Sequence, residues 1–506
     1  MSKKRVRWIK RFKTWHKWPA IIIAFLAVLF AVSGIVMNHR SVFSSAEVSR
    51  KLLPQSYTYK HWNLDAVKGS LVLSDDSVFV YGKAGVFLTD KSFTSFSNYN
   101  KGFPSGIDNR SITSLIHTQQ TGLVAGTLHG LYLCQSNNNW QKVSLPVSNE
   151  RITDLTQKGD TLIILTRDYM LKSVKLINSE VIEIAAPEGY KKQTSWFKFL
   201  WNLHSGELFG IVGKLLVDLL GIVVIIISIT GLIHYFYRKY VKKKISKSFK
   251  QQNLNWHNKL GYWFVLFLMI NALSGMFLRP PLLIAIAKAK MSIIPHTHLD
   301  NDNPWYDKLR KIRWNEDLGI YILSSSEGFY FLNETCSISH QPKIVQPPVS
   351  VMGCNVLQQV SSTEYIVGSF SGLFSWNIKS GLVYDVGNGK PYATKETMGR
   401  PISNHMVSGL VYLDNANAWY SDYNKGMQRI TAEKEFAEMP KVIAQAPISL
   451  WNLCLEIHTG RIFESFLGPF YILYVPLSGI CVLMVLVSGF FLWYWVYRKK
   501  KSPKEL

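Results

Sequence analysis

The stretch Trp256-His257-Asn258-Lys259-Leu260-Gly261 opens an apolar run that ends at Ser274-Gly275. A run of about 20 apolar residues is long enough to cross a bilayer as a helix. Near the N-terminus, Trp15-His16 opens another apolar run, which ends at Ser33-Gly34. Two stretches that lie far apart in the chain are therefore predicted to be copies of one membrane span with a histidine at its start.

Two further apolar runs also match each other. One lies between His204-Ser205-Gly206 and Thr230-Gly231, and the other lies between His458-Thr459-Gly460 and Ser488-Gly489. The chain is therefore predicted to be a duplicated two-span unit. The first run is long and no small-residue cleavage site follows it, which predicts an anchor that is retained. The four predicted spans are residues 18–37, 208–235, 260–278 and 466–496.

Two long polar segments between the spans must fold outside the lipid. The predicted fold class is membrane α + β: a four-helix transmembrane bundle from a duplicated two-span unit, with an external β-propeller-like domain built from two large loops. The predicted segments are a basic tail and first span (1–39), an external β segment (40–205), the second span (206–237), a basic loop (238–256), the third span (257–281), a second external β segment (282–457), the fourth span (458–497) and a tail (498–506).

The net charge of +24 is concentrated beside the predicted spans. Basic short segments mark the cytoplasmic side of a membrane, so both termini are predicted to be cytoplasmic and both long segments external. The same residues attract anionic lipid headgroups, so membrane lipid is the predicted partner and nucleic acid is not. The basic residues are Lys3, Lys4, Arg5, Arg7, Lys10, Arg11, Lys13, Arg238, Lys239, Lys242, Lys243, Lys244, Lys247, Lys250, Arg498, Lys499, Lys500 and Lys501.

Both external segments repeat a phrase in which two strands rich in β-branched and aromatic residues meet at a glycine turn. One copy, Val124-Ala125-Gly126-Thr127-Leu128-His129-Gly130-Leu131-Tyr132, resembles the repeats of sensor propellers. The copies lie about 40 to 54 residues apart, which is the scale of one four-stranded blade. About three copies in each segment predict that both segments close into one propeller-like domain. Two separate small β-sandwiches are the alternative.

The five cysteines show none of the spacings of a covalently attached haem or a zinc ribbon. Cys134, Cys336 and Cys354 fall in the external segments, where an oxidising compartment permits a disulfide. Their pairing is left open.

The sequence contains no nucleotide-binding glycine motif, no zinc-protease motif and no nucleophile elbow. The loop between the second and third predicted spans is too short to form a flavin or nicotinamide domain. The electron donor of any redox reaction is therefore predicted to be a lipid-soluble quinol or a separate redox protein.

Histidines at the ends of the predicted spans fall into two layers. The cytoplasmic layer contains His16, His234 and His257, and the external layer contains His39, His204 and His458. Neutral imidazoles from two helices can hold a haem iron on both axial sides.

The duplication predicts how these histidines pair. His16 and His257 are equivalent in the two repeats and are expected to hold an inner haem b. His204 and His458 are expected to hold an outer one. Two stacked haems would carry electrons across a hydrocarbon core about 30 Å thick. His39 and His234 have no histidine counterpart in the other repeat and are the substitute ligands. The alternative is that all these histidines are interfacial anchors or hydrogen-bonding caps.

Asp218 is an acidic residue inside the second span, and Lys214 precedes it by one helical turn. Ionisable residues inside a membrane are functional candidates. Asp218 is a candidate for proton transfer from a quinol, and Lys214 is a candidate partner of a haem propionate. An ion pair within the helix is the alternative.

The motifs around the spans resemble the PepSY-associated transmembrane family, which includes inner-membrane reductases of periplasmic ferric siderophores. The resemblance covers the four spans and their flanks, including the stretch His458-Thr459-Gly460-Arg461. It implies electron transfer from the membrane pool through b haems to an external ferric chelate. It also implies that the haem ligands are His16, His204, His257 and His458. The external segments show no clear PepSY domain, which leaves the acceptor open among a metal complex, a redox protein and a lipoprotein partner.

The predicted protein is a multi-pass oxidoreductase of a bacterial inner membrane that contains two haem b groups. It would take electrons from the membrane pool and reduce a periplasmic ferric complex, such as a ferric siderophore, in iron uptake. The alternative is a non-catalytic membrane sensor or assembly protein whose periplasmic β-domain binds a partner.

Overall fold

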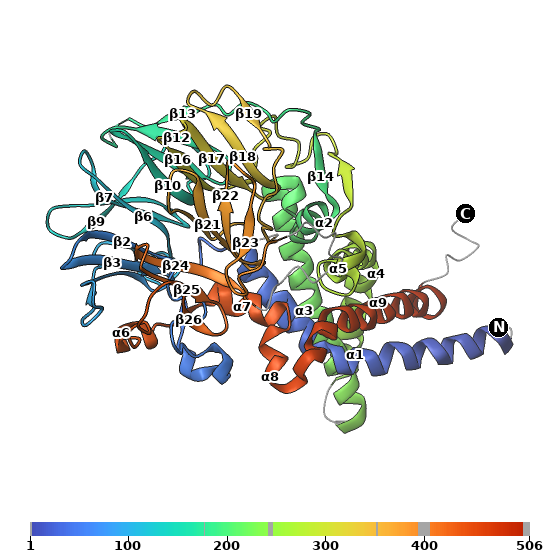
Figure 1. Cartoon of the computed structure of the whole chain (residues 1–506). Helices are drawn as coiled ribbons and strands as arrows, with labels where there is room; N and C mark the ends of the chain where they lie inside the picture. Colours follow the sequence, from blue (N-terminus) through green and yellow to red (C-terminus); the bar gives the residue numbers. More distant parts are fainter. Residues whose placement is uncertain (1–2, 177, 241–245, 351–352, 393–404, 499–506) are drawn as a thin grey trace. The chain divides into compact units, whose positions relative to one another are not determined.

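The computed structural model describes residues 3–176, 178–240, 246–350, 353–392 and 405–498. Contacts divide the chain into two compact units (Figure 1). The helical unit comprises Met1–Phe43, Lys192–Asn301 and Leu450–Leu506, and the β unit comprises Ser44–Lys191 and Asp302–Ser449. Some basic residues that predict a cytoplasmic side lie outside the described residues, namely Lys242, Lys243, Lys244, Lys499, Lys500 and Lys501.

Four helical segments of the described chain are long and apolar enough to cross a membrane, as the sequence predicts. They are Lys3–Asn38, Glu207–Phe236, Ser248–Phe277 and Arg461–Tyr497. Their main helices are α1 (Lys3–Asn38), α3 (Gly210–Tyr240), α4 (Lys247–Phe277) and α9 (Tyr474–Leu492). Helix α1 packs against α3 and α9, and α4 packs against the same two helices, so the four helices form a bundle.

A short helix precedes each of the two spans that return through the bundle. Helix α2 (Trp196–Ser205) leads into α3, and α7 (Leu450–His458) leads towards α9. Gly206 ends α2 with a φ of 79°, and Gly460 follows α7 with a φ of 78°. A β-carbon at Gly206 would lie 2.1 Å from the carbonyl oxygen of Gly213, so only glycine fits this turn. The two equivalent turns hold His204 and His458 at the ends of their short helices.

Short elements complete the helical unit. Strands β14 (Gln193–Ser195) and β15 (Lys290–Ser292) pair in antiparallel fashion. The remaining elements are η3 (Glu207–Phe209), α5 (Leu282–Ile286), η4 (Arg461–Phe463), α8 (Glu464–Leu467), η5 (Gly468–Leu473) and the π-helical turn η6 (Trp493–Tyr497).

The first external segment forms three antiparallel sheets of four strands, each in the order of the chain. The first sheet contains β2 (Gly69–Ser74), β3 (Ser77–Gly82), β4 (Gly85–Thr89) and β5 (Ser97–Asn98). The second contains β6 (Ile112–Thr118), β7 (Gly122–Thr127), β8 (Gly130–Cys134) and β9 (Trp140–Val143). The third contains β10 (Ile152–Lys158), β11 (Thr161–Thr166), β12 (Met170–Ser173) and β13 (Glu180–Ile182).

The second external segment forms sheets of the same kind, the last with three described strands. They contain β16 (Leu309–Asn315), β17 (Ile320–Ser325), β18 (Gly328–Asn333) and β19 (Ser339–His340); β20 (Val356–Gln359), β21 (Glu364–Ser369), β22 (Gly372–Asn377) and β23 (Val383–Asp385); and β24 (Val407–Asp414), β25 (Asn417–Asp422) and β26 (Gly426–Arg429). Minor elements are β1 (Glu47–Val48), which pairs with β27 (Ile448–Ser449), and η1 (Arg50–Leu52), η2 (Gln55–Tyr57) and α6 (Lys441–Ala444).

The glycine phrases lie where the second strand of a sheet turns into the third. Gly130 begins β8 with a φ of 140°, and Gly372 begins β22 with a φ of 132°. A side chain is strained at such angles, so these turns favour glycine. The neighbouring strand residues alternate into buried cores that include Trp140 and Trp376.

The two external segments meet at two seams within the β unit. At one seam, β2 packs against β24, and Ser70 Oγ accepts a hydrogen bond of 2.9 Å from the Tyr412 backbone N–H. At the other, β10 packs against β16, and the buried carboxylate of Asp154 lies 3.2 Å from Lys311 Nζ and 2.6 Å from Arg313 Nη1. The alternative of two separate sandwiches is therefore wrong, because both segments contribute to one compact unit.

The cations beside Asp154 control its ionisation. Burial alone would raise the pKa of Asp154, but the charges of Arg313 and Lys311 outweigh it and hold the pKa below its usual range. The carboxylate also accepts a hydrogen bond of 3.0 Å from the Ile312 backbone N–H. This seam is therefore held by a buried ionic cluster. All five cysteines are free, so no disulfide contributes.

Candidate functional site

Two pairs of histidines meet inside the helical unit. The ring centroids of His16 and His257 lie 6.1 Å apart, with an angle of 79° between the ring planes. Those of His204 and His458 lie 6.0 Å apart, with an angle of 63°. The structure thus brings together the two pairs that the duplication predicts. Each pair takes one histidine from each half of the chain.

All four imidazoles are held in the same way by the backbone of a span. In each case the imidazole forms a hydrogen bond with the carbonyl oxygen of the residue four positions before the glycine of a Ser-Gly or Thr-Gly pair, through Nδ1 at His16, His204 and His257. These contacts join His16 to Val485 (3.0 Å), His204 to Asn271 (3.0 Å), His257 to Ile227 (3.1 Å) and His458 to Phe30. A carbonyl oxygen only accepts hydrogen bonds. Each Nδ1 therefore carries the hydrogen, and each Nε2 keeps a free lone pair.

The hydroxyl groups of the Ser-Gly and Thr-Gly pairs reinforce this tautomer. Ser33 Oγ lies 2.9 Å from Nδ1 of His458, and Thr230 Oγ1 lies 3.1 Å from Nδ1 of His257. Both hydroxyls already donate to carbonyls of their own helices, with distances of 2.6 Å for Ser33 and 2.7 Å for Thr230. They therefore accept the Nδ1 hydrogen. Ser274 Oγ is placed in the same way, 3.4 Å from Nδ1 of His204.

The glycine of each pair lies against the imidazole ring. A β-carbon would come within 3.5 Å of His458 Cε1 at Gly34, 3.2 Å of His257 Cε1 at Gly231, 2.7 Å of His204 Cε1 at Gly275 and 2.9 Å of His16 Cε1 at Gly489. We call the set of carbonyl, hydroxyl residue and glycine a histidine seat. The sequence predicts a role for these glycines in close approach of a flat macrocycle or in helix packing. The structure shows that they make room for the imidazoles themselves.

Each of the four paired histidines occupies a seat in the opposite half of the chain. His16 of α1 lies in the seat of α9, and His458 lies in the seat of α1. In the equivalent exchange, His204 lies in the seat of α4, and His257 of α4 lies in the seat of α3. Asn271 strengthens the third contact, because its side-chain amide also donates to the His204 carbonyl oxygen at 2.9 Å.

This arrangement suits axial ligation of one metal ion by each pair. A metal–imidazole bond of about 2 Å and about 1 Å from ring nitrogen to ring centre place two axial rings about 6 Å apart. The observed separations match that value. Hydrogen bonding of the second ring nitrogen to a carbonyl is the usual support of a histidine ligand. Among the described residues, no three or more His, Cys, Asp or Glu side chains lie together as a metal-ligand group.

His39 pairs with Asp218. Its Nε2 atom lies 2.6 Å from Asp218 Oδ2, and Asn38 Nδ2 donates to Asp218 Oδ1 at 3.2 Å. Asn38 Nδ2 also lies 3.2 Å from the carbonyl oxygen of Ser205, the residue after His204. His39 and Asp218 therefore form a polar contact between α1 and α3 beside the turn that carries His204.

Lys214 does not pair with Asp218. Its Nζ atom lies 3.0 Å from Glu207 Oε1, at the start of the same span. The alternative of a Lys214–Asp218 ion pair is therefore replaced by a Lys214–Glu207 pair, because the N-terminal turn of the span brings Glu207 within reach. His234 lies close enough to His257 for an electrostatic interaction and belongs to the inner layer.

Sequence reasoning missed two features of this site. One is the exchange of seats between the halves, although the regular spacing of Phe30, Ser33 and Gly34 recurs in all four spans. The other is Arg279, whose Nη2 atom lies 3.4 Å from the carbonyl oxygen of Thr459, the residue after His458. Its signal was its position four residues after Gly275, which matches that of Asn38 after Gly34.

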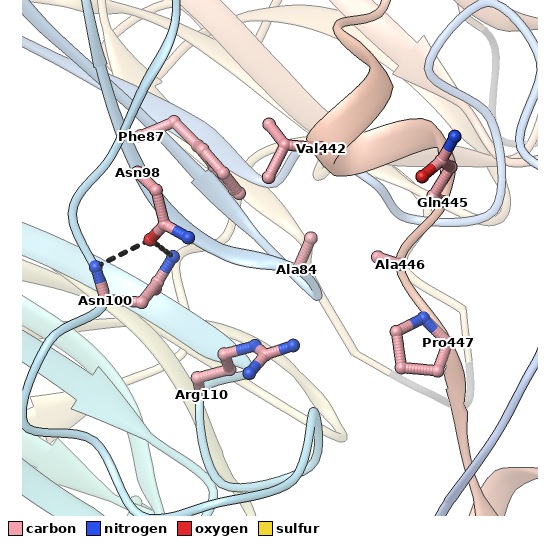
Figure 2. A pocket seen from close by; sticks show the side chains of 9 residues that line it. All are labelled: Ala84, Phe87, Asn98, Asn100, Arg110, Val442, Gln445, Ala446 and Pro447. Carbon is pink, nitrogen blue, oxygen red and sulfur yellow. Dashed lines mark hydrogen bonds between the residues drawn. The ribbon is translucent and has the colours of Figure 1, made fainter.

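A pocket of about 170 Å³ lies within the β unit (Figure 2). Its polar lining comes from Asn98, Asn100, Arg110 and Gln445. The Asn100 side chain is already engaged, because its Oδ1 atom accepts the Val86 backbone N–H at 2.8 Å. Apolar side chains, including that of Phe87, form the rest of the wall.

A family model described as "PepSY-associated TM region" matches residues 1–239 and again residues 172–497. The chain therefore belongs to the PepSY-associated transmembrane family and is a multi-pass membrane protein. The two matches together span both halves of the duplicated bundle. No curated protein matches the sequence.

Solved structures resemble the chain only weakly. An extracellular domain of the putative hybrid two component system BT4673 from B. thetaiotaomicron is 8% identical with a TM-score of 0.36, over 71% of this chain and 32% of that one. A streptogramin B lyase is 7% identical with a TM-score of 0.32, over 72% and 94%. The chain thus spans about a third of the length of the BT4673 domain. These scores are too low to define the fold.

Proposed function

We propose that this protein is a haem b-containing membrane oxidoreductase that passes electrons across the membrane to an external acceptor. One observation carries the proposal: two histidine pairs with centroid separations of 6.1 and 6.0 Å, in which every imidazole is hydrogen-bonded to a backbone carbonyl. His16 and His257 would hold one haem b, and His204 and His458 would hold the other. Haem b, when bound, supplies reversible one-electron chemistry.

The residues of the chain orient the haem ligands and set the spacing between the two histidine layers. The seats fix the ring orientation and keep Nε2 available at each of the four histidines. Since the ligands of each layer come from different helices, the spacing of the layers is set by the bundle. The electron donor is proposed to be a quinol of the membrane pool or a redox protein, because the sequence contains no nucleotide-binding motif.

The proposed location is a bacterial inner membrane, with both termini cytoplasmic and the β unit periplasmic. This orientation is supported by the basic residues that flank the spans. In this orientation the pair His204–His458 lies on the periplasmic side. The acceptor is proposed to be a ferric complex, such as a ferric siderophore, in keeping with the reductases that the family includes.

We also infer that the β unit is a six-bladed propeller. The support is the packing of the first strands of successive sheets, which follow the order β2, β6, β10, β16, β20 and β24, with β24 again beside β2. Each sheet is an antiparallel meander, as in a propeller blade. Such a domain would present loops for an acceptor or a protein partner.

Absorption spectroscopy of detergent-purified protein tests the proposal. Reduced-minus-oxidised spectra should show b haem at about two per chain, and His257→Ala and His458→Ala should each remove about one. His340→Ala, an exposed position in the β unit, is the matched control and should keep both. A colourless preparation would overturn the proposal and favour the non-catalytic sensor or assembly protein.

Stopped-flow mixing tests the direction of electron flow. The protein is reduced with dithionite and freed of excess reductant under anaerobic conditions. A ferric chelate should then reoxidise it, and ferrous iron should form at the same rate as the haem is oxidised. His458→Ala should slow this reoxidation. If the chelate leaves the reduced spectrum unchanged, a ferric complex is not the acceptor.

A further inference from the structure

Two arginines lie beside the outer histidine pair. Arg279 follows helix α4 and donates through Nη2 to the Thr459 carbonyl oxygen at 3.4 Å, and its charge acts on His458. Arg461 lies three residues after His458, in η4. The two guanidinium groups are close enough to repel each other electrostatically. They therefore form one cationic cluster at the turn that carries His458.

The cluster has more positive than negative charge. Glu456 pairs with Arg461, which leaves the charge of Arg279 without an equal counter-charge in this group. Burial, and then the charge of Arg461, lower the pKa of Arg279. Tyr471 and Glu456 act in the opposite direction and are outweighed. Two guanidinium groups that share one carboxylate can accept a further anion.

Buried donors in the cluster are also unsatisfied. The Nε atoms of Arg279 and Arg461 are buried, and neither has a hydrogen-bond partner among the described residues. Buried N–H groups almost always bond to protein, water or a ligand. These two donors indicate that an acceptor belongs at this place. The planar fork of a guanidinium group matches a carboxylate well.

The equivalent position in the other half has the opposite character. Asn38 lies four residues after Gly34, as Arg279 lies four residues after Gly275. Asn38 also donates to the carbonyl oxygen after a paired histidine, that of Ser205. There the nearby charge is the carboxylate of Asp218, which pairs with His39. The two sides of the outer layer therefore differ: one is cationic and the other already holds an anion.

We propose that Arg279 and Arg461 bind the propionate carboxylates of the outer haem and so fix which edge of the porphyrin faces the His458 turn. This inference rests on the proposed haem function. The Asp218 side would repel a carboxylate, so the propionate edge of the porphyrin would face the His458 turn. Arg279 and Arg461 are positioning residues for the cofactor.

The test compares haem b with its dimethyl ester, which has the same ring and iron but no carboxylates. Haem-free full-length protein carrying His257→Ala is titrated with each porphyrin in detergent. Because this variant lacks a ligand of the inner site, the absorption bands report binding at the outer site alone. This chain should bind haem b about tenfold or more tightly than the ester, since charge-assisted hydrogen bonds are lost with the ester. Adding Arg279→Gln should abolish that preference by weakening haem b alone.

Two variants separate a charge effect from a folding effect. Arg461→Gln should reduce the preference in the same direction, and Lys288→Gln, at an exposed cation of the same unit, should leave it unchanged. Undiminished ester binding by Arg279→Gln shows that the site is folded. Equal binding of haem b and ester by the parent chain overturns the propionate assignment but leaves the haem function intact. If the chain that carries His257→Ala alone binds neither porphyrin, the propionate assignment and the haem function are both overturned.

Discussion

The imidazole of His204 lies against the backbone of Gly275, where a β-carbon would come within 2.7 Å of the ring atom Cε1. The corresponding distance from Gly34 to His458 Cε1 is 3.5 Å, which is ordinary contact. The two seats of the outer layer thus differ in how closely the ring approaches the helix.

We expect Gly275→Ala to displace His204 and to weaken outer haem binding by about tenfold to a hundredfold, the range for loss of a supporting contact to a histidine ligand. Gly34→Ala should have little effect, because the added methyl group fits. The measurement is haem titration of the purified variants followed by reduced-minus-oxidised spectra. Equal losses in the two variants would contradict the idea that the ring contact is what requires glycine at this seat.

Ser33 provides a second test of the seats. Its hydroxyl accepts from Nδ1 of His458 at 2.9 Å, whereas the hydrogen bonds that the Ser488 hydroxyl makes to described residues go to the Met484 and Val485 carbonyl oxygens of its own helix. We expect Ser33→Ala to weaken outer haem binding by about tenfold, because His458 then keeps only the Phe30 carbonyl as its acceptor. Ser488→Ala is the matched control and should leave inner haem binding close to normal. A shift of the outer haem midpoint potential in Ser33→Ala, measured by spectroelectrochemistry, would report the same lost hydrogen bond.

Asp218 should stabilise the bundle rather than bind haem directly. Removing its carboxylate in Asp218→Ala leaves His39 Nε2 without its partner and leaves Asn38 Nδ2 with the Ser205 carbonyl oxygen as its remaining acceptor. We expect a loss of about 1–3 kcal/mol of stability, the cost of leaving a partly buried polar group unsatisfied. Lys214→Ala breaks a more exposed pair and should cost less than about 1 kcal/mol. Thermal unfolding in detergent, followed by circular dichroism at helical wavelengths, measures both. A larger loss in Lys214→Ala would show that the Asp218 contacts are not structural.

The ionic seam of the β unit should make its stability depend on pH. Because the folded pKa of Asp154 is depressed, its stabilisation is present at neutral pH. That stabilisation is lost as the pH falls from about 4, the value for unfolded Asp, through the lower folded pKa. We expect Asp154→Asn to cost about 3–5 kcal/mol at pH 7, because it leaves the buried Lys311 and the partly buried Arg313 without their shared partner.

Unfolding of the β unit, followed by tryptophan fluorescence at several pH values, measures this effect. The stability curves of the wild type and Asp154→Asn should converge as the pH drops below about 4. A constant difference between them at all pH values would mean that the carboxylate charge is not what holds the seam.

The sequence predicted the helices and the pairing of the histidines because both predictions follow from local sequence patterns. Long apolar runs specify spans whatever surrounds them, and the matching of Trp15-His16 with Trp256-His257 reveals the duplication. The repeated sheets of the β unit were predictable for the same reason, since glycine turns such as that at Gly130 are local sequence signals.

Contacts between distant residues could not be read in this way. The partner of Lys214 is Glu207 rather than Asp218, because a turn before α3 brings Glu207 within reach. The role of Gly275 depends on a ring that arrives from helix α2. The cationic cluster at Arg279 depends on where the Thr459 turn lies in space. Such contacts depend on how distant elements pack, and a single sequence does not specify which of their residues meet.

The exchange of seats has a consequence for how such a protein can arise and change. A two-span half on its own would contain histidines and histidine seats, but each histidine needs the seat of the other half. Two halves are therefore required to form a complete site. Joining them in one polypeptide fixes their ratio at one to one and makes assembly independent of concentration. It also frees the copies from having to stay identical, and Asn38 and Arg279 are equivalent positions at which the two copies differ.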